Sequence, residues 1–314
     1  KNLRPIALYS LVQKLGSAVL HRRLVASSEK HCLLPPEISS YKRGVGTTDA
    51  LHLLLPTIHN AKFHKKNIMI YNSDLSSAFD FASRLMVDDV MTKMAIPDGF
   101  IRMMKNSEDG SRIVLAGQPG GPNTEMFFDQ TSGFSQGGKL SGHGFCLCIS
   151  MLLLKINSSK KLTRFIPMIN NVRRVNNNTG KPAHAYADDA YTVLSAEPQH
   201  LLKNIREIVN IYKEFGSISA LTLNTKKSTL SFPLEIPDKN TCEELFSLGF
   251  NPTNITKDIK YLGYNLKNGD FKESVKEMLA TRTDKIRVIS RAFNKGTAGP
   301  VSYTHLTLPT RSYV

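Results

Sequence analysis

The chain has 314 residues, and 41% of them are hydrophobic, which is enough to fill the core of one large domain or two smaller ones and excludes an intrinsically disordered protein. Its 41 Lys and Arg residues outnumber 26 Asp and Glu residues and leave a net charge of +15, which predicts a polyanionic partner: nucleic acid, or alternatively an anionic membrane surface. The most apolar stretch, residues 145–154, is shorter than the ~18 residues that cross a bilayer, so we expect a soluble protein.

Four cysteines match no zinc-binding or disulfide spacing: Cys32, Cys146, Cys148 and Cys242. We interpret them as buried free thiols of a protein in a reducing, intracellular compartment. The sequence begins at Lys1 rather than Met and shows no targeting pattern, so we expect a fragment.

Apolar residues at a helical period predict a first helix over residues 11–24. A second helix follows the capping residues 47–49, and Pro56 should bend or break it. Residues 67–75, "NIMIYNSDL", read as a buried strand, and the stretch 82–94 as a helix.

The second half of the chain mixes strands and helices without a regular order. Residues 117–131 predict a loop or hairpin, and residues 173–184 a basic, turn-rich segment. Further elements are expected as helices over 145–155, 198–216 and 272–295, a strand pair over 220–232 and a short strand over 259–266. Without regular βαβ alternation, this order favours an α+β fold over a doubly wound one.

Two adjacent aspartates interrupt the alternating run "AYADDAYTVL", which we interpret as a hairpin with its turn at Asp188 and Asp189. Aspartate is also an ordinary turn residue, because its side chain accepts bonds from local backbone N–H groups. Two neighbouring carboxylates repel each other unless a cation lies between them, and a hard divalent ion would serve. Asp74, at the end of the strand 67–73, is a candidate third carboxylate. This layout predicts a two-metal phosphoryl-transfer site with ions about 4 Å apart.

Other aspartates are less suited to bind metal. Asp80 should lie at the start of the following helix, where the helix dipole favours a negatively charged side chain. Asp88 and Asp89 form a similar pair, but they lie on a predicted helix without turn residues, so we interpret them as surface residues.

Seven strings occur in an order that resembles one family: "NLRPIALYSLVQKLGSAVLHRRL", "YKRGVGTTDAL", "YNSDLSSAFD", "SGFSQGGKLSG", "YADD", "LNTKKS" and "IKYLGYNL". Over residues 1–266 the chain resembles the reverse transcriptase domain of non-LTR retrotransposons, which is related to the polymerases of group II introns and telomerase. The resemblance implies a right-hand polymerase with fingers, a palm with an antiparallel sheet backed by helices, and a thumb.

The resemblance also implies the metal ligands. Asp74 corresponds to the first metal-binding aspartate, Asp188 to the second, and Asp189 to the neighbour that completes the acidic hairpin. Leu75 would contribute a backbone carbonyl. Two Mg²⁺ ions are expected, with Mn²⁺ as a substitute.

Several further residues match substrate-binding positions of the family. Phe79 would lie beneath the incoming sugar and reject a 2′-OH, although an ordinary core phenylalanine is the alternative. Gln136 and Gly137 match a "QG" pair that contacts nucleotide and template. Arg4 resembles the arginine of the fingers that holds the triphosphate, for which a planar fork of donors is suited.

Two departures from the family occur near the "QG" pair. Lys139 stands where a proline usually follows, and Gly142 and His143 stand where another proline is common. The geometry of this loop is therefore an open question at the level of sequence.

The lysine-containing string and the hairpin after it carry the remaining assignments. Lys227 resembles the lysine that protonates the leaving pyrophosphate, with Lys226 as a substitute and a solvated surface lysine as the alternative. The primer-grip hairpin is matched by Tyr261, Leu262 and Gly263. A basic stripe that could follow template phosphates, or simply face solvent, consists of Arg287, Arg291 and Lys295.

These assignments predict a domain plan. Residues 1–66 would form N-terminally truncated fingers, and residues 67–256 the palm with a fingers-side insertion around 100–130. Residues 257–300 would form the primer-grip hairpin and the start of a truncated thumb. Residues 301–314 resemble translated sequencing-adapter DNA, so we expect a non-native tail.

The function implied is RNA-templated DNA synthesis from dNTPs on a DNA primer, with no membrane partner and with an endonuclease domain elsewhere in the full-length protein. In a eukaryote the protein would act in the nucleus or in a cytoplasmic ribonucleoprotein. Two alternatives are a non-catalytic reverse-transcriptase-like relic that binds nucleic acid, and an RNA-dependent RNA polymerase. The relic should lack the acidic set, which is present here, and the RNA polymerase should carry a small or polar residue in place of Phe79.

Overall fold

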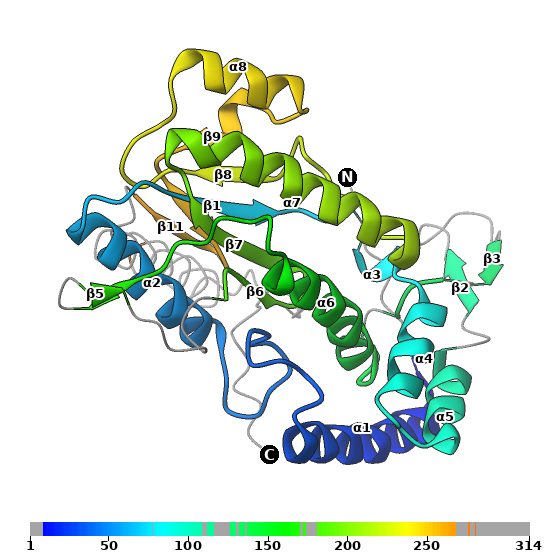
Figure 1. Cartoon of the computed structure of the whole chain (residues 1–314). Coiled ribbons are helices and arrows are strands. Elements are labelled where there is room, and N and C mark those ends of the chain that lie inside the picture. The colour runs from blue at the N-terminus through cyan, green and yellow to red at the C-terminus, as the bar shows by residue number, and fades with distance from the viewer. Residues whose placement is uncertain are drawn as a thin grey trace, which may run out of the picture.

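The computed structural model describes residues 9–76, 78–108, 112–115, 126–129, 132–135, 137–169, 172–173, 181–267, 276 and 280 (Figure 1). Several predictions from sequence lie outside these residues. They concern Arg4, Gln136, the stripe of Arg287, Arg291 and Lys295, and the tail at 301–314.

Helices and strands alternate irregularly, which confirms the predicted α+β class. The helices are α1 Leu11–His31, α2 Thr47–Phe63, α3 Ala78–Phe81, α4 Arg84–Lys93, α5 Asp98–Glu108, α6 Ser141–Ser158, α7 Pro198–Ser219, α8 Lys239–Ser247 and the 3₁₀ helix η1 Pro252–Asn254. The strands are β1 Ile68–Ser73, β2 Arg112–Leu115, β3 Met126–Asp129, β4 Met168–Ile169, β5 Val172–Arg173, β6 Ala183–Tyr186, β7 Asp189–Ser195, β8 Thr229–Ser231, β9 Ile255–Thr256, β10 Ile259–Tyr261 and β11 Tyr264–Leu266.

A five-stranded sheet with the order β6-β7-β1-β8-β9 forms the centre of the molecule. The first four strands pair antiparallel, as predicted, but β8 and β9 pair parallel, so the sheet is mixed rather than antiparallel throughout. A separate two-stranded hairpin is formed by β10 and β11. The strand predicted at 67–75 is confirmed as β1, at the middle of the sheet.

The two faces of β1 pack against different helices. Met69 and Tyr71 belong to the main core, which includes residues of α4, α6 and α7. Ile68 and Ile70 point the other way and pack with buried residues of α2, β7 and the β10–β11 hairpin. Figure 1 shows α6 and α7 on one side of the sheet and α2 on the other. Since both faces are covered, β1 is apolar on both, which explains its continuous hydrophobic run.

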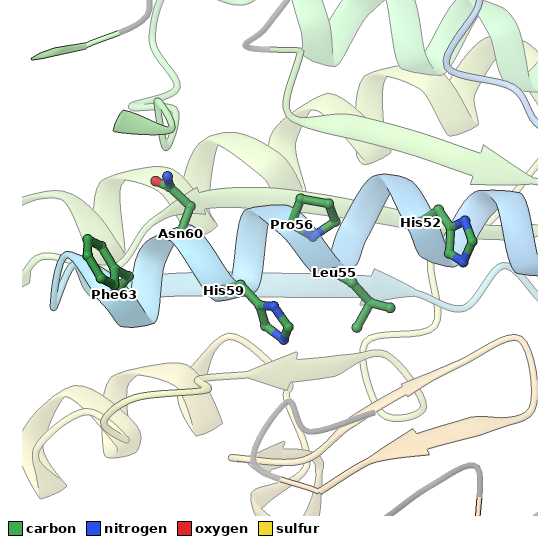
Figure 2. Close-up of a pocket in the computed structure, with 6 residues that line it drawn as sticks. All are labelled: His52, Leu55, Pro56, His59, Asn60 and Phe63. Carbon is green, nitrogen blue, oxygen red and sulfur yellow. The ribbon is translucent and has the colours of Figure 1, made fainter. Parts of the chain in front are cut away.

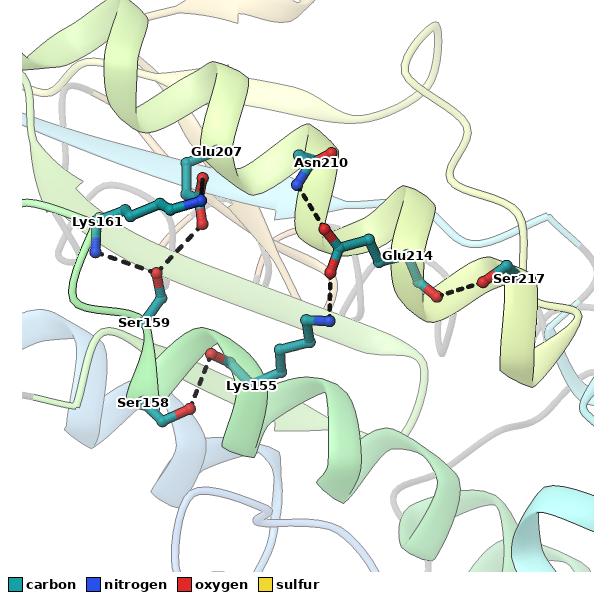
Figure 3. Close-up of polar contacts among 8 residues, drawn as sticks. All are labelled: Lys155, Ser158, Ser159, Lys161, Glu207, Asn210, Glu214 and Ser217. Atoms are coloured by element: carbon teal, nitrogen blue, oxygen red, sulfur yellow. Dashed lines mark hydrogen bonds and ion pairs between the residues drawn. The ribbon is translucent and has the colours of Figure 1, made fainter.

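Polar contacts link α6 and α7 along their exposed edges (Figure 3). Lys155 pairs with Glu214, whose other carboxylate oxygen accepts from Asn210 at 2.7 Å. Ser159 donates to Glu207 at 3.3 Å. Exposed ion pairs contribute little to stability, so the packing of these helices rests on their buried apolar faces.

The prediction that Pro56 bends or breaks the second helix is wrong: α2 runs unbroken from Thr47 to Phe63. The proline lies on the exposed face of α2, beside His52 and His59 along a groove of about 600 Å³ (Figure 2). Water can solvate a backbone carbonyl left without its N–H partner on that face, while the opposite face is held by core contacts of residues such as Leu54 and Ile58.

Three other expectations need correction. The strand pair predicted over residues 220–232 is a left-handed cap at Ala220, a single bridge between Leu75 and Leu223, and the short strand β8. Cys32 is exposed rather than buried, whereas Cys146 and Cys148 are buried and Cys242 is intermediate; all four are free thiols. The apolar face predicted for the first helix is only partly covered, because Leu20 and Leu24 contact the core while residues 11, 12, 15 and 19 stay exposed.

Strands β2 and β3, near the loop or hairpin predicted over residues 117–131, pair antiparallel. The predicted helices over 82–94, 145–155 and 198–216 are confirmed as α4, α6 and α7, and the strand over 259–266 is split into a hairpin. In the described part of the chain, no helix combines the length and hydropathy that spanning a membrane requires.

Candidate active site

The pairing of β1 with β7 brings the acidic residues together. Ser73, the last residue of β1, is opposite Ala190, so Asp74 follows the paired part of β1 directly and Asp189 directly precedes Ala190 on β7. Opposite residues on antiparallel strands have Cα atoms about 4.5–5.5 Å apart. The Ser73 hydroxyl fixes this end of the pair, because it donates to the Ala190 carbonyl at 3.3 Å and accepts from Tyr212 at 2.7 Å.

The acidic hairpin turns one residue earlier than predicted. Tyr186 pairs with Asp189, so the two turn residues are Ala187 and Asp188, and Asp189 already belongs to β7. Ala187 adopts a left-handed conformation with φ of 55°, which is unfavourable for a residue with a Cβ. Asp188 and Asp189 both remain solvent exposed at the end of the hairpin.

The charges of the three carboxylates act on one another. Partial burial raises the pKa of Asp74; the charge of Lys227 lowers it and that of Asp188 raises it. Desolvation of the carboxyl group by the surrounding protein raises the pKa of Asp189 to about 6, and the charges of Asp188 and Asp74 add to the increase. Asp74 and Asp189 therefore resist ionisation in the absence of a compensating cation.

The donor set fits a hard divalent cation in its chemistry. Within the residues that the structure describes, no group of three or more His, Cys, Asp or Glu side chains is already arranged to hold a metal ion. Repulsion between the carboxylates opposes such an arrangement until a cation neutralises it. Leu75 follows Asp74 in the chain, and the bridge between Leu75 and Leu223 uses the Asp74 carbonyl and the Ser76 N–H rather than the Leu75 carbonyl. The assignment of the metal ligands remains a prediction.

The backbone of Asp74 is held by the loop that carries Lys227. The Asp74 N–H donates to Ser228 Oγ at 3.0 Å, and its carbonyl accepts from the Asn224 N–H at 2.9 Å. Ser228 is buried and donates in turn to the Asn224 carbonyl at 2.8 Å. Lys227 is exposed at this turn and close enough to Asp74 to act on its pKa, whereas Lys226 is exposed one residue before it.

Phe79 has a structural role in the molecule. Its ring is stacked on Phe145 of α6, with centroids 4.4 Å apart and an interplanar angle of 19°, and it packs against the main core. Its carbonyl accepts from the Phe134 N–H at 2.6 Å. Phe79 as a whole is of intermediate exposure.

Gly142 and His143, which stand where the family often has a proline, both pack closely against other segments at the start of α6. A Cβ on Gly142 would lie 2.1 Å from the ring of Tyr41, so glycine makes room for this ring. His143 is buried beside His21, with ring centroids 5.2 Å apart, and burial lowers its pKa to about 4. Gly137 has a φ of 106°, a conformation that favours glycine.

The β10–β11 hairpin lies beside Asp189 and the end of β1. Asn72 Nδ2 donates to the Lys260 carbonyl at 2.7 Å, and the rings of Tyr191 and Tyr261 meet edge to face at 5.0 Å. Leu262 and Gly263 form the turn, both with positive φ. A cavity of about 330 Å³ lies between this hairpin and β1, and its lining includes Asp189, Asn72 and all three residues of the predicted primer grip.

The family model for reverse transcriptases (RNA-dependent DNA polymerases) matches residues 1–266 of the chain. The chain belongs to the reverse transcriptase family. Enzymes of this family generally use divalent metal ions. Together with the α+β architecture, the match confirms the predicted polymerase fold class and the predicted activity class, an RNA-directed DNA polymerase.

Two curated relatives are retrotransposon proteins. The chain is 27% identical over 271 residues to the retrovirus-related Pol polyprotein from the type-2 retrotransposable element R2DM of Drosophila melanogaster, covering 84% of this chain and 23% of the relative. It is 25% identical over 227 residues to the Pol polyprotein from the type-1 retrotransposable element R2 of Popillia japonica, covering 72% and 29%. The reverse transcriptase domain thus spans less than a third of the relatives it matches, and the predicted resemblance to non-LTR elements is confirmed.

Solved structures similar to this chain include telomerases. The telomerase of Candida tropicalis in complex with a fragment of telomeric RNA has a TM-score of 0.47 and 11% identity, covering 83% of this chain and 37% of the telomerase. The telomerase of Candida albicans, also with a telomeric RNA fragment, has a TM-score of 0.48 and 10% identity, covering 82% and 37%.

Sequence reasoning missed three residues of the reverse transcriptase site. Ser228 holds the Asp74 backbone, Ser40 contacts the acidic turn, and Tyr41 packs on Gly142 near Asp188. Serine and tyrosine at these positions carry no local signal, because their roles depend on contacts between segments far apart in the sequence. Asp89 is exposed, as predicted, whereas Asp88 is only partly exposed and pairs with Lys105 at 2.9 Å.

Proposed function

We propose that this domain extends a DNA primer with dNTPs on an RNA template, with two Mg²⁺ ions as cofactors. The observation that carries the proposal is the register of β1 and β7, which pairs Ser73 with Ala190 and so brings the adjacent residues Asp74 and Asp189 to the same end of the sheet, beside the turn at Asp188. In this reaction the primer 3′-OH attacks the α-phosphate of the dNTP, and pyrophosphate leaves.

The carboxylates of Asp74, Asp188 and Asp189, with the Leu75 carbonyl, would hold the ions. Bound Mg²⁺ would supply Lewis-acid stabilisation of the attacking and leaving oxygens. In this proposal the charge of Lys227 lowers the pKa of Asp74 and offsets part of the increase caused by burial. Asp189, with a pKa of about 6, would be mostly ionised at neutral pH, and a bound cation would stabilise its charged form.

The other groups would bind and orient the substrates. Lys227 would donate a proton to the leaving pyrophosphate, since it is exposed next to Asp74. Arg4, Gln136 and Gly137 would contact the triphosphate and template. The β10–β11 hairpin, with Tyr261, Leu262 and Gly263, would hold the primer end above Asp189, which is supported by the cavity that these residues line.

Phe79 would exclude a 2′-OH from the nucleotide, which distinguishes the proposal from an RNA-dependent RNA polymerase. Its stacking on Phe145 supports this role, because a ring fixed by α6 presents a rigid wall. Replacing Phe79 with Val should raise rNTP incorporation relative to dNTP incorporation. Equal discrimination in the variant and the wild type would favour a purely structural Phe79.

We extend the proposal to the organisation of the full protein. The domain limits follow the sequence prediction: fingers to residue 66, palm from 67 to 256, and hairpin with the start of the thumb from 257 to 300. An endonuclease elsewhere in the full-length protein would nick DNA to provide the primer, and the protein would act inside the cell on element RNA. The retrotransposon relatives and the net charge of +15 support this plan.

Primer extension on an RNA template with Mg²⁺ tests the activity. Asp188→Asn should abolish nucleotide incorporation, whereas the matched control Asp89→Asn, an exposed aspartate on α4, should retain it. Undiminished extension by Asp188→Asn, or no extension by the wild type on either an RNA or a DNA template, would contradict the proposal.

A further inference from the structure

A segment before α2 extends the central sheet past its edge strand β6. The Ala185 N–H donates to the Glu37 carbonyl at 3.0 Å, and the Ser39 N–H donates to the Ala185 carbonyl at 2.9 Å. These bonds form a parallel bridge between Ile38 and Ala185. The chain of residues 37–41 therefore runs alongside β6 toward the acidic turn.

At the end of this segment, Ser40 contacts the turn itself. The Ala187 N–H donates to Ser40 Oγ at 2.8 Å, and Ser40 is buried with only 1% of its surface exposed. Ala187 is the left-handed residue immediately before Asp188. An L-residue in this conformation costs about 1 kcal/mol or more, so it persists only where its surroundings hold it in place.

The Ser40 hydroxyl is fixed from its other side by α6. Its oxygen lies 3.2 Å from Cys146 Sγ, within hydrogen-bonding distance for a thiol, in a buried environment. Burial raises the pKa of Cys146 to about 12, so this thiol stays neutral and adds no charge near the acidic residues. Since the hydroxyl accepts from Ala187, its own hydrogen is available for the sulfur, and the turn is tied to the buried helix α6.

The next residue reinforces this attachment. Tyr41 also has a positive φ, 56°, and its ring lies against Gly142 in the first turn of α6. Burial raises the pKa of Tyr41 to about 12, and the charge of Asp188 contributes to the increase, which places this ring near the acidic turn. The consecutive residues Ser40 and Tyr41 thus both contact α6.

We propose that Ser40 is a positioning residue for the acidic turn: its hydroxyl fixes the conformation of Ala187 and thereby orients the Asp188 carboxylate for the divalent ion. This inference rests on the proposed metal-binding role of Asp188. It adds a residue from the segment before α2 to the machinery of the site, although Ser40 touches neither metal nor substrate.

The test compares Ser40→Ala with a matched variant, Ser150→Ala. Ser150 is also a fully buried serine, but its hydroxyl donates to the Leu147 carbonyl within α6, away from the turn. Hydrogen exchange of a peptide that spans residues 183–190 reports on the turn without requiring activity. Loss of one hydrogen bond should speed exchange of its protected amide by about fivefold in Ser40→Ala and leave it unchanged in Ser150→Ala.

Binding of Mn²⁺, followed by electron paramagnetic resonance on the same proteins, is the second measurement. We expect the Mn²⁺ dissociation constant to rise about fivefold or more in Ser40→Ala and to stay at the wild-type value in Ser150→Ala. Cys146→Ala, which keeps the bond between Ser40 and Ala187, should change both quantities less than Ser40→Ala does. Thermal unfolding of each variant shows that it is folded.

The outcomes separate this inference from the proposed function. Faster exchange together with weaker Mn²⁺ binding supports the positioning role, even if the wild type fails to incorporate nucleotides and the polymerase proposal is lost. Unchanged exchange in Ser40→Ala overturns the role. Faster exchange with unchanged Mn²⁺ binding also overturns it, since Ser40 would then stabilise the turn without orienting a ligand.

Discussion

The Asp189→Asn substitution exposes the electrostatic cost of the acidic site. In the wild type, the surrounding protein and the charges of Asp188 and Asp74 raise the pKa of Asp189 to about 6 from its usual 3.8. The folded state therefore binds a proton more tightly than the unfolded chain. The free energy of unfolding of the wild type should fall as the pH rises from about 4 to about 6 and level off above that range.

The size of the effect follows from the displaced pKa. A difference of about two pH units corresponds to ~3 kcal/mol between the two protonation states. Asp189 is exposed to solvent, which screens much of this energy, so we expect about 1 kcal/mol. Asp189→Asn should therefore be about 1 kcal/mol more stable than the wild type near neutral pH, and equally stable at about pH 4, where Asp189 is mostly protonated in the folded state.

Urea denaturation followed by circular dichroism, with a chelator present, measures this difference. The control is Asp89→Asn, which removes an exposed aspartate from α4 and should show no such pH-dependent gain. Added Mg²⁺ should then stabilise the wild type more than Asp189→Asn, because the ion offsets repulsion that the variant lacks. A variant less stable than the wild type near neutral pH, or an equal response to Mg²⁺, would refute the reasoning.

Two further predictions concern the neighbours of the acidic residues. Ser228→Ala should lower the free energy of unfolding by about 1–3 kcal/mol, because the Asp74 N–H loses its partner, and should raise the Mg²⁺ concentration needed for nucleotide incorporation. The control Ser231→Ala, which removes a buried hydroxyl that donates to the Asp258 carbonyl, should lower stability but leave the Mg²⁺ requirement unchanged. The same Mg²⁺ dependence of incorporation in both variants would contradict this prediction. Gly142→Ala should lower the free energy of unfolding by about 1–3 kcal/mol, because the new Cβ displaces the Tyr41 ring. Urea denaturation should show a smaller loss when the same substitution is made in Tyr41→Ala, and equal losses in the two backgrounds would exclude the steric explanation.

Local sequence patterns predicted the elements that position the site. The apolar run of β1 and the alternation around β6 and β7 both depend on side chains within one segment, so the two strands and the acidic turn could be found from sequence. The predicted turn, at Asp188 and Asp189, is one residue later than the observed turn, because Ala187 adopts the left-handed conformation and Asp189 already pairs within β7. Propensity favours aspartate over alanine in this conformation, but the hydrogen bond that the Ala187 N–H donates to Ser40 Oγ stabilises the less favoured residue.

Long-range contacts account for what the sequence did not predict. The parallel pairing of β8 with β9 joins segments on either side of α8, and neither short strand carries a pattern of its own. Ser228 and Ser40 are ordinary serines in local sequence, and only the folded chain brings them to Asp74 and Ala187. Pro56 is tolerated because it lies on the exposed face of α2, a face that can be identified only once the packing is known.

We propose that Asp74, directly after β1, and Asp188, in the β6–β7 turn, hold the same divalent ions. Mn²⁺ binding by the wild type, Asp74→Asn and Asp188→Asn, measured by electron paramagnetic resonance, tests it most directly. The account predicts that each single substitution weakens binding at least about tenfold. Wild-type affinity in either variant would contradict it.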